Sequence, residues 1–363
     1  MIKAKEKPIK EKPTKEKPTK EKPWEKAMRN NKGLLPSRRQ ILKAAGLAAG
    51  AAAAPMLTPG RAFAATYPER PIRIIVPFAP AGPTDIMARI VGQSLGDALG
   101  GNVIVENRPG ASGNIGIGYV AHAEADGYTL LVVSSAYVVN PSLFARIPYD
   151  PSKDFAPITE LGTTPNMIVV SPKLGINSIT ELFARAKAKP DELNYASPGA
   201  GTTPHLSAEL LKIVGQVQIT HVPFSGAAPA IQALLAGTTQ MAVAALPAAL
   251  PFVQSGEIKA LALTGERRWN DLPTVPTMIE LGYKDFIAET AQFFFAPAKT
   301  PPDIVTRLAT KTMQVLKQPE VIAQLHANGY DVAADGPDAL RKYVESQVPK
   351  WRDVIARAGI KPV

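Results

Sequence analysis

From Tyr67 onward, short apolar runs alternate with longer amphipathic stretches along the chain. The runs are rich in valine, isoleucine and leucine and have the length of strands, whereas the stretches space apolar residues three and four positions apart, as helices do. Strands that alternate with helices favour an α/β fold with mostly parallel sheets flanked by helices. The predicted strands are 72–76, 103–106, 129–133, 167–170, 218–221, 241–244, 259–263 and 293–296.

Residues that commonly cap helices mark several helix beginnings. Ser178 and Glu181 match a capping box, which predicts a helix from there to about residue 187. Thr203 before Pro204 predicts an N-cap followed by a proline in the first turn, and Ala228 before a proline predicts another helix start. The last part of the chain is predicted to hold helices at 302–317, 319–328 and 337–358 and a short strand at 331–333.

The length of 363 residues exceeds that of one ordinary domain, so two domains are predicted. A run of helices at the end of an α/β chain often packs back onto the first domain and makes it discontinuous. We therefore expect one lobe from 65–167 and 288–363 and a second lobe from 168–287, with crossovers near 162–170 and 289–294. Residues 1–64 form a leader.

The leader combines a repeat with the features of an export signal. Residues 5–23 repeat KEKP every five positions, and the regular prolines with few apolar residues predict disorder. Arg38 and Arg39 precede an alanine- and glycine-rich run, which resembles a twin-arginine signal peptide and is too short for a stable membrane span. We expect export to the periplasm with cleavage near Ala64, and translation starts at Met1 or Met28.

The positive charge of the chain is concentrated in this leader. The whole chain has a formal charge of +10, but residues 1–64 hold 16 basic and 5 acidic residues, which leaves 25 basic and 26 acidic residues in 65–363. A protein that follows a phosphate backbone needs clustered lysine and arginine on its folded part. The distribution therefore argues against a nucleic-acid partner.

The sequence offers no convincing catalytic or metal-binding motif. There are no cysteines, which excludes thiolate metal sites and a cysteine nucleophile, and the four histidines lack metal-ligand spacing. Ser197 lacks the preceding glycine of a nucleophile elbow, and the glycines at 113–118 have the reverse order of a dinucleotide-binding loop. We expect no catalytic residue, cofactor or metal.

Three loops that follow strands and precede helices are the candidate ligand site. Small residues let the backbone approach a ligand, and amides at a helix N-terminus suit a carboxylate or phosphate. Ligands of open α/β sheets bind at this edge. For each loop taken alone, the alternative is an ordinary turn whose small residues serve the backbone and not a ligand. The candidate residues are Pro80, Ala81, Gly82, Thr84 and Asp85 in the first loop, Ser134, Ser135 and Ala136 in the second, and Ser197, Gly199, Gly201, Thr202 and His205 in the third.

Some of these residues have alternative interpretations. Asp85 either contacts the ligand or caps its own helix, and His205 either orients the ligand or packs inside the fold. Phe224 and Ser225 form a fourth candidate loop, in which packing is favoured for Phe224. Arg89 and Arg108, the basic residues near these loops, are expected to form structural ion pairs.

The loops and the segments around them resemble the receptors of tripartite tricarboxylate transporters, the Bug family. The similarity keeps its order over 67–363. The matching segments are 67–78, Gly82-x-x-Asp85-x-x-Ala88-Arg89, 105–116, 125–130, 195–206, 221–224 with 229–230, 234–237 and 295–298.

This resemblance implies a type II-like periplasmic-binding-protein fold, a Venus flytrap that closes on a small carboxylate and delivers it to membrane permease subunits. It also implies that 80–85, 134–136 and 197–205 are the ligand loops. Two departures stand out: Ala81 replaces a usual glycine, and Ala244 replaces a frequent acidic residue. Without that carboxylate we expect a plain carboxylate ligand, not an amino acid.

The sequence thus predicts an exported, monomeric, non-enzymatic receptor. One rival is a periplasmic hydrolase or isomerase that uses His205 and Asp85 as acid and base. The other is a sensory module that loads a signalling partner in place of a permease. The sequence does not name the carboxylate.

Overall fold

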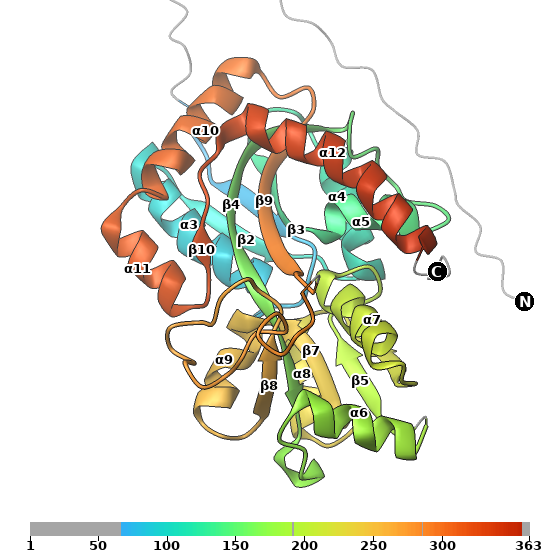
Figure 1. Cartoon of the computed structure of the whole chain (residues 1–363). Helices are drawn as coiled ribbons and strands as arrows, with labels where there is room; N and C mark the ends of the chain where they lie inside the picture. Colours follow the sequence, from blue (N-terminus) through green and yellow to red (C-terminus); the bar gives the residue numbers. More distant parts are fainter. Residues whose placement is uncertain (1–66, 191, 285, 358–363) are drawn as a thin grey trace, which may run out of the picture. The chain divides into compact units, whose positions relative to one another are not determined.

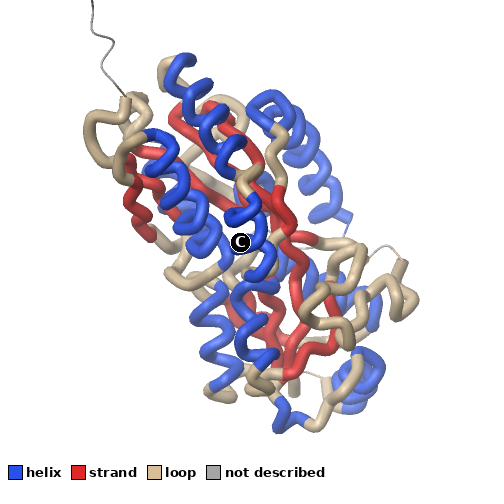
Figure 2. The backbone as a smooth tube through the Cα atoms, turned by 90° about the vertical axis from the view of Figure 1, so that its left-hand side faces the viewer, coloured by secondary structure: helices blue, strands red, loops and turns tan. Residues whose placement is uncertain are grey.

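The computed structural model describes residues 67–190, 192–284 and 286–357, which belong to a compact unit spanning Ala65–Val363. The KEKP repeat, the twin-arginine segment and its cleavage site lie outside the described residues. Within them, ten strands form a curled sheet flanked by helices (Figures 1 and 2), and the predicted α/β class is confirmed.

One end of the sheet consists of parallel strands, each followed by a helix that returns the chain for the next strand. Every residue of the third strand is buried, as in parallel sheets covered on both faces. These strands are β1 (Ile72–Val76), β2 (Val103–Asn107) and β3 (Thr129–Ser134). The helical segments are α3 (Pro83–Leu99), η1 (Ala111–Gly113), α4 (Asn114–Ala121) and α5 (Ala136–Leu143). We call these elements the first half.

The other end repeats this arrangement and is called the second half. Its parallel strands are β5 (Asn194–Ser197), β6 (Thr220–Pro223) and β7 (Met241–Ala245), and β8 (Lys259–Leu263) runs antiparallel to the long strand described next. Its helical segments are η2 (Pro172–Leu174), α6 (Ile179–Ala188), α7 (Thr203–Gly215), α8 (Ala227–Leu235) and α9 (Leu246–Gln254).

Two antiparallel strands connect the halves (Figure 1). The early part of β4 (Phe155–Val170) pairs with β9 (Glu289–Pro297), and its end pairs with β7 and β8. The strand order is β2-β1-β3-β9-β4-β7-β5-β6, with β10 (Asp331–Val332) also on β4. After β9 the chain packs back on the first half through α10 (Pro302–Val315), α11 (Pro319–Ala327) and α12 (Gly336–Arg357).

The buried apolar residues form three clusters. The largest combines residues between 67 and 161 with residues between 291 and 355 and one leucine from α7, and the two others lie between 167 and 286. This division supports the expected lobes, although their boundaries stay a prediction because residues 65–363 form one compact unit.

The eight predicted strands are present, with ends that differ by a few residues or, for β4, by a whole segment. Strand β5 was not predicted, and two helix starts were misplaced. The N-cap of α7 is Thr202, whose Oγ1 accepts a hydrogen bond from the His205 amide at 3.5 Å. The N-cap of α8 is Gly226, which places Ala228 inside the helix.

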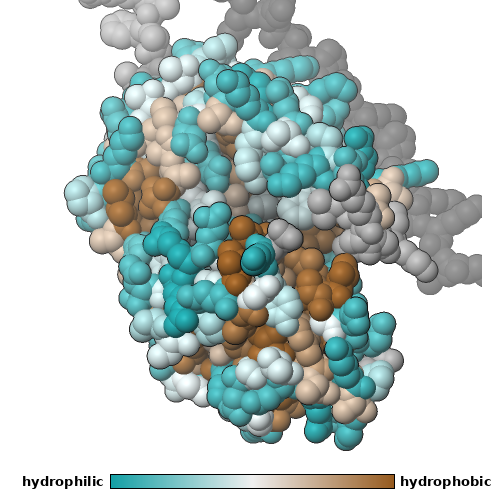
Figure 3. Space-filling view, viewed as in Figure 1, coloured by the Kyte–Doolittle hydropathy of each residue, from teal (hydrophilic) through white to brown (hydrophobic). Residues whose placement is uncertain are grey.

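The face of the molecule seen in Figure 3 is mainly polar, with small apolar patches over α7, α11 and the segment between β8 and β9. The exposed large apolar side chains include Ile213 of α7 and Ile322 of α11. Among the described helices, none combines the length and the hydrophobicity that a membrane crossing requires.

Candidate functional site

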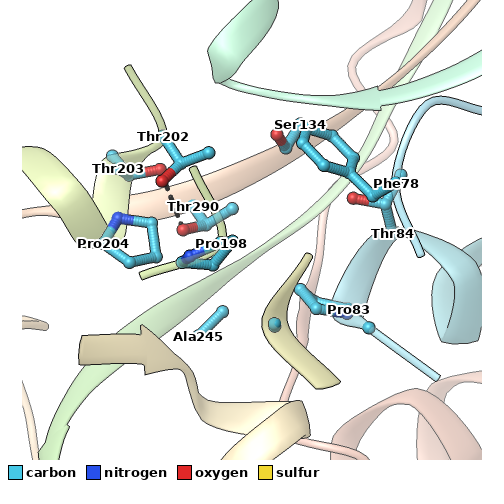
Figure 4. Close-up of a pocket in the computed structure, with 12 residues that line it drawn as sticks. Phe78, Pro83, Thr84, Ser134, Pro198, Thr202, Thr203, Pro204, Ala245 and Thr290 are labelled. Carbon is cyan, nitrogen blue, oxygen red and sulfur yellow. Dashed lines mark hydrogen bonds between the residues drawn. The ribbon is translucent and has the colours of Figure 1, made fainter. Parts of the chain in front are cut away.

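A small pocket lies where the two halves meet. Its volume is about 20 Å³. Residues from the first half face residues from the second half across it, and Thr290 of β9 lies between them (Figure 4). The lining residues are Phe78, Gly82, Pro83, Thr84, Ser134, Pro198, Thr202, Thr203, Pro204, Ala227, Ala245 and Thr290.

Helices from both halves point their N-termini at this pocket. In the first half, Gly82 is the N-cap of α3. In the second half, Thr202 caps α7, Ala227 begins α8, and Ala245 is the N-cap of α9. The N-terminal end of a helix carries partial positive charge and amides without intrahelical partners. None of the twelve described lining residues is charged, so the positive potential that the lining itself supplies comes from these helix N-termini.

The polar side chains of the pocket are hydroxyls. Thr203 and Thr290 share a hydrogen bond of 2.9 Å between their Oγ1 atoms (Figure 4). Thr290 also donates to Asn166 Oδ1 at 2.8 Å. Thr84 and Ser134 lie on the opposite side of the pocket. Thr202 Oγ1 donates to the Gly199 carbonyl at 2.7 Å, so this hydroxyl shapes its own loop.

In the first loop, Asp85 is a structural anchor. Its carboxylate accepts hydrogen bonds from the Ala81 amide, from Arg89 and from Asn107 at 2.9 to 3.0 Å. Burial raises the pKa of Asp85, but these hydrogen bonds outweigh it, and the pKa lies below its usual value. The hydrogen bond from the Ala81 amide to Asp85 holds Ala81 at φ of 59°, in the left-handed region that favours glycine.

In the second loop, only Ser134 lines the pocket. Ser135 bonds to the backbone of β9, because its Oγ accepts from the Ala291 amide at 2.8 Å and its own amide donates to the Ala291 carbonyl at 3.0 Å. Ala136 is fully buried at the start of α5. The loop is therefore tied to the strand that connects the halves.

The third loop rests on two imidazole rings that contact each other at a tilt of 32°. The His205 and His221 rings are 4.3 Å apart, His205 Nδ1 accepts from the Gly201 amide at 3.2 Å, and His221 Nε2 bonds to Ser197 Oγ at 2.7 Å. Burial lowers the pKa of His205, and burial followed by the His205 charge lowers the pKa of His221 to about 3. Both rings are neutral near pH 7, and neither lines the pocket.

The fourth loop contacts the first loop beside the pocket. The Ala79 amide of the first half donates to the Ser225 carbonyl of the second half at 3.2 Å. A Cβ on Gly226 would lie 2.9 Å from Ala79 Cβ, and a Cβ on Gly199 would lie 2.9 Å from Ser112 Oγ. The halves are thus in close contact. Phe224 packs against a core cluster of the second half, as favoured from the sequence.

The predicted residues therefore occupy two layers. Gly82, Thr84, Ser134 and Thr202 line the pocket, whereas Asp85, Ser135, Ser197 and His205 support the loops behind it. Pro80, Ala81, Ala136, Gly199, Gly201, Phe224 and Ser225 do not line it either. The expected ion pairs of Arg89 with Asp85 and of Arg108 with Glu106 are present.

Eight lining residues were not among the predicted site residues. Four of them, Pro83, Pro198, Thr203 and Pro204, lie within the predicted loops 80–85 and 197–205. Phe78 lies just before the first loop, and Ala227 begins α8. Ala245 ends a parallel strand, where the rule for ligand sites in α/β sheets points. Thr290 begins an antiparallel strand and carries no such signal.

A family model for tripartite tricarboxylate transporter receptors matches residues 87–360. The chain belongs to this receptor family. A curated relative of this receptor is BugT of Bordetella pertussis, 38% identical over 298 residues, which are 82% of this chain and 91% of BugT. The solved periplasmic binding proteins that it matches show that the receptor has their two-lobe fold, as predicted.

Two solved relatives of the receptor contain carboxylates. Rpa4515 of R. palustris, solved with adipate, is 34% identical, with a TM-score of 0.79 over 82% of this chain and 100% of that chain. MatC of Rhodopseudomonas palustris, solved with bound malate, is 32% identical, with a TM-score of 0.75 over 80% of this chain and 100% of that chain.

Proposed function

We propose that the chain is an extracytoplasmic receptor that binds a small carboxylate between its lobes and delivers it to a tripartite permease. The observation that carries this proposal is the uncharged pocket surrounded by helix N-termini from both halves. Fixed dipoles that converge from two sides stabilise a compact anion without a counter-charge. The carboxylates in Rpa4515 and MatC support the same ligand class.

Ligand entry requires the lobes, 65–167 with 288–363 and 168–287, to separate. A volume of about 20 Å³ holds about one water molecule, whereas pockets for small molecules typically measure about 300 Å³ or more. The paired strands β4 and β9 cross between the lobes and form the hinge. Separation breaks the Ala79–Ser225 hydrogen bond at the pocket and two contacts elsewhere. These are the Arg267–Asp331 ion pair at 2.7 Å and the Trp269–His326 stack at 4.6 Å.

Gly82, Thr84, Ser134 and Thr202 contact the ligand in this proposal, through amides and hydroxyls. The remaining predicted residues hold those groups in place. The enzyme alternative is disfavoured because Asp85 is bonded to Arg89 and Asn107, while His205 is bonded to Gly201 and packed against His221. Neither side chain reaches the pocket to act as acid or base.

Calorimetric titration of the full chain with mono-, di- and tricarboxylates and with amides of the same shape tests ligand class. We expect a carboxylate to bind and its amide to show no detectable binding. Solution scattering should show a smaller radius of gyration at saturation. Failure of every carboxylate to bind, or chemical conversion of one that binds, would contradict the proposal.

Localisation and delivery need separate measurements. N-terminal sequencing of the periplasmic protein should begin at Ala65, close to the predicted cleavage site. Uptake of the bound carboxylate into vesicles that contain the permease subunits should depend on added receptor, acting as a monomer. Uptake that proceeds without the receptor, together with binding to a sensor kinase, would favour the sensory alternative.

A further inference from the structure

Gln292 of β9 does not itself line the pocket, but the strand register places it beside two residues that do. Side chains alternate along a strand, so Gln292 shares a face with Thr290, two positions earlier. Its register partner on β3 is Ser134. Residues directly opposite in an antiparallel ladder share a face, with Cβ atoms roughly 5 Å apart. The Gln292 carboxamide is thus flanked by pocket residues on two sides.

Both polar atoms of this carboxamide lack a partner. Gln292 is 0% exposed, and neither Nε2 nor Oε1 has a hydrogen bond within the described part of the chain. On its other side it faces Gly162 of β4, which has no side chain. The nearest side chain above that glycine is Met87 of α3, whose Cε would lie 3.4 Å from an added Cβ. Neither of these two residues carries a nitrogen or oxygen atom in its side chain.

An unpaired buried carboxamide is costly to a fold and is rare in native proteins. A leucine or methionine in β9 would fill the same space without that cost. Thr312 of α10 also has a buried hydroxyl without a partner, but no strand places it beside pocket residues. The location of Gln292 next to Ser134 and Thr290 is what points to a ligand.

We infer that Gln292 determines specificity and selects a hydroxycarboxylate, an inference that rests on the proposed function. A carboxamide presents one acceptor and two N–H donors. A hydroxyl beside a carboxylate can donate to Oε1 while a carboxylate oxygen accepts from Nε2. A plain alkyl carboxylate only accepts, and it leaves Oε1 unpaired. Sites built to bond a hydroxyl reject the analogue that lacks it, because their own polar groups then stay unsatisfied.

The test compares pairs of ligands that differ by one hydroxyl on the full-length wild-type chain and on Gln292→Met. The pairs are malate with succinate, 2-hydroxyglutarate with glutarate, and lactate with propionate. In the wild type, the hydroxylated member of a bound pair should bind at least about tenfold more tightly, or about 1.4 kcal/mol. In Gln292→Met this preference should fall to about twofold or less, because the group that tells the two ligands apart is gone.

The melting temperature without ligand gives an independent readout. Gln292→Met should melt at the same or a higher temperature, because it removes an unpaired polar group from a buried site. Thr312→Val is the matched control, since it too removes an unpaired buried polar group, in this case a hydroxyl. It should leave ligand preference unchanged. A lower melting temperature of Gln292→Met would show a partner inside the protein and overturn the inference.

The outcomes separate this inference from the proposed function. Binding of carboxylates with no hydroxyl preference in the wild type overturns the role of Gln292 and leaves the receptor proposal intact. An equal preference in wild type and Gln292→Met does the same. Absence of binding by every carboxylate in the three pairs and in the mono-, di- and tricarboxylate panel overturns both proposals.

Discussion

Two loops approach the pocket from opposite halves, and they are held by opposite kinds of chemistry. The first loop depends on charge, because the Asp85 carboxylate is bonded to Arg89, to Asn107 and to the backbone of the loop. The third loop depends on neutrality, because His205 and His221 accept or share hydrogen bonds as uncharged rings.

The contrast shows how an anion site can be rigid without a charged side chain at its surface. Charges and titratable rings lie behind the loops and fix the backbone, while amides and hydroxyls face the pocket. A fully charged partner would bind one anion strongly but would also be costly to desolvate. Helix dipoles that the fold already holds in place avoid that cost, and the shape of the pocket then discriminates among anions.

The strongest challenge to this arrangement is a negative charge in the pocket. In Ala245→Asp a carboxylate enters a site where none of the described lining residues is charged. Repulsion of a bound carboxylate should weaken binding by at least about 100-fold, or about 3 kcal/mol. Calorimetric titration measures it. Ala245→Asn has the same shape without charge, and if it weakened binding equally, size and not charge would be responsible.

Removing the charge that anchors the first loop should have the next largest effect. Asp85→Asn keeps the shape but loses the ionic bonds, so the free energy of unfolding should fall by about 2 kcal/mol. This value allows for the 52% exposure of the Arg89 side chain, which solvent screens. Urea denaturation measures it. Arg341→Gln is the control, because it breaks an exposed pair with Asp338 on α12 and should change stability little.

Acid should weaken the third loop before the first. The pKa of His221 is about 3 in the folded chain, where Glu209 and Lys212 also face it, and about 6.5 when unfolded. The unfolded chain therefore binds the proton more readily, and stability falls as the pH drops below about 6.5. Between pH 8 and pH 5 the protonation of this histidine in the unfolded chain should lower the free energy of unfolding by about 2 kcal/mol.

The lowered pKa of Asp85 affects stability only below about pH 4, which separates the two loops. Urea denaturation at several pH values should show a flatter profile for His221→Gln than for the wild type. His122→Gln, on the distant α4 end, is the control and should keep the wild-type slope. Equal slopes for all three proteins would show that the third loop does not depend on neutral His221.

The smallest expected effect concerns the backbone. Ala81 has φ of 59°, whereas the third loop already has glycine at its positive-φ positions, Gly199 and Gly201. Ala81→Gly should therefore raise the free energy of unfolding by about 0.5–1 kcal/mol. Gly201→Ala should lower it, since its Cβ would also lie 2.7 Å from Asn140 Oδ1. No gain in Ala81→Gly would indicate that the Asp85 bond already relieves the strain.

Much of the fold was predictable because its strands are local apolar runs with clear ends. Strand β5 was missed because its four residues, 194–197, include the small polar residues of a loop motif. The first part of β4 was missed because Pro157 and Gly162 interrupt the pattern, and both lie at irregularities in its pairing with β9. Such pairing depends on a strand more than a hundred residues away.

The candidate site was predictable as a set of loops but not as a set of side chains. Small residues and helix starts identify where a backbone approaches a ligand. They do not show that Asp85 and His205 turn away from the pocket, because that orientation depends on Asn107 and His221 from other strands. Gln292 gave no signal at all, since a glutamine in a strand is distinctive only when its neighbours are known.

The stacked pair of Trp269 and His326 gives the protein a built-in optical probe. The sequence contains three tryptophans, at 24, 269 and 351, and the proposed cleavage near Ala64 would remove the first. Trp269 is 3% exposed and stacks on His326 of α11, which belongs to the other proposed lobe. Opening of the proposed lobes should bring water to the indole and move its fluorescence to longer wavelength, so that ligand capture can be timed without any attached dye.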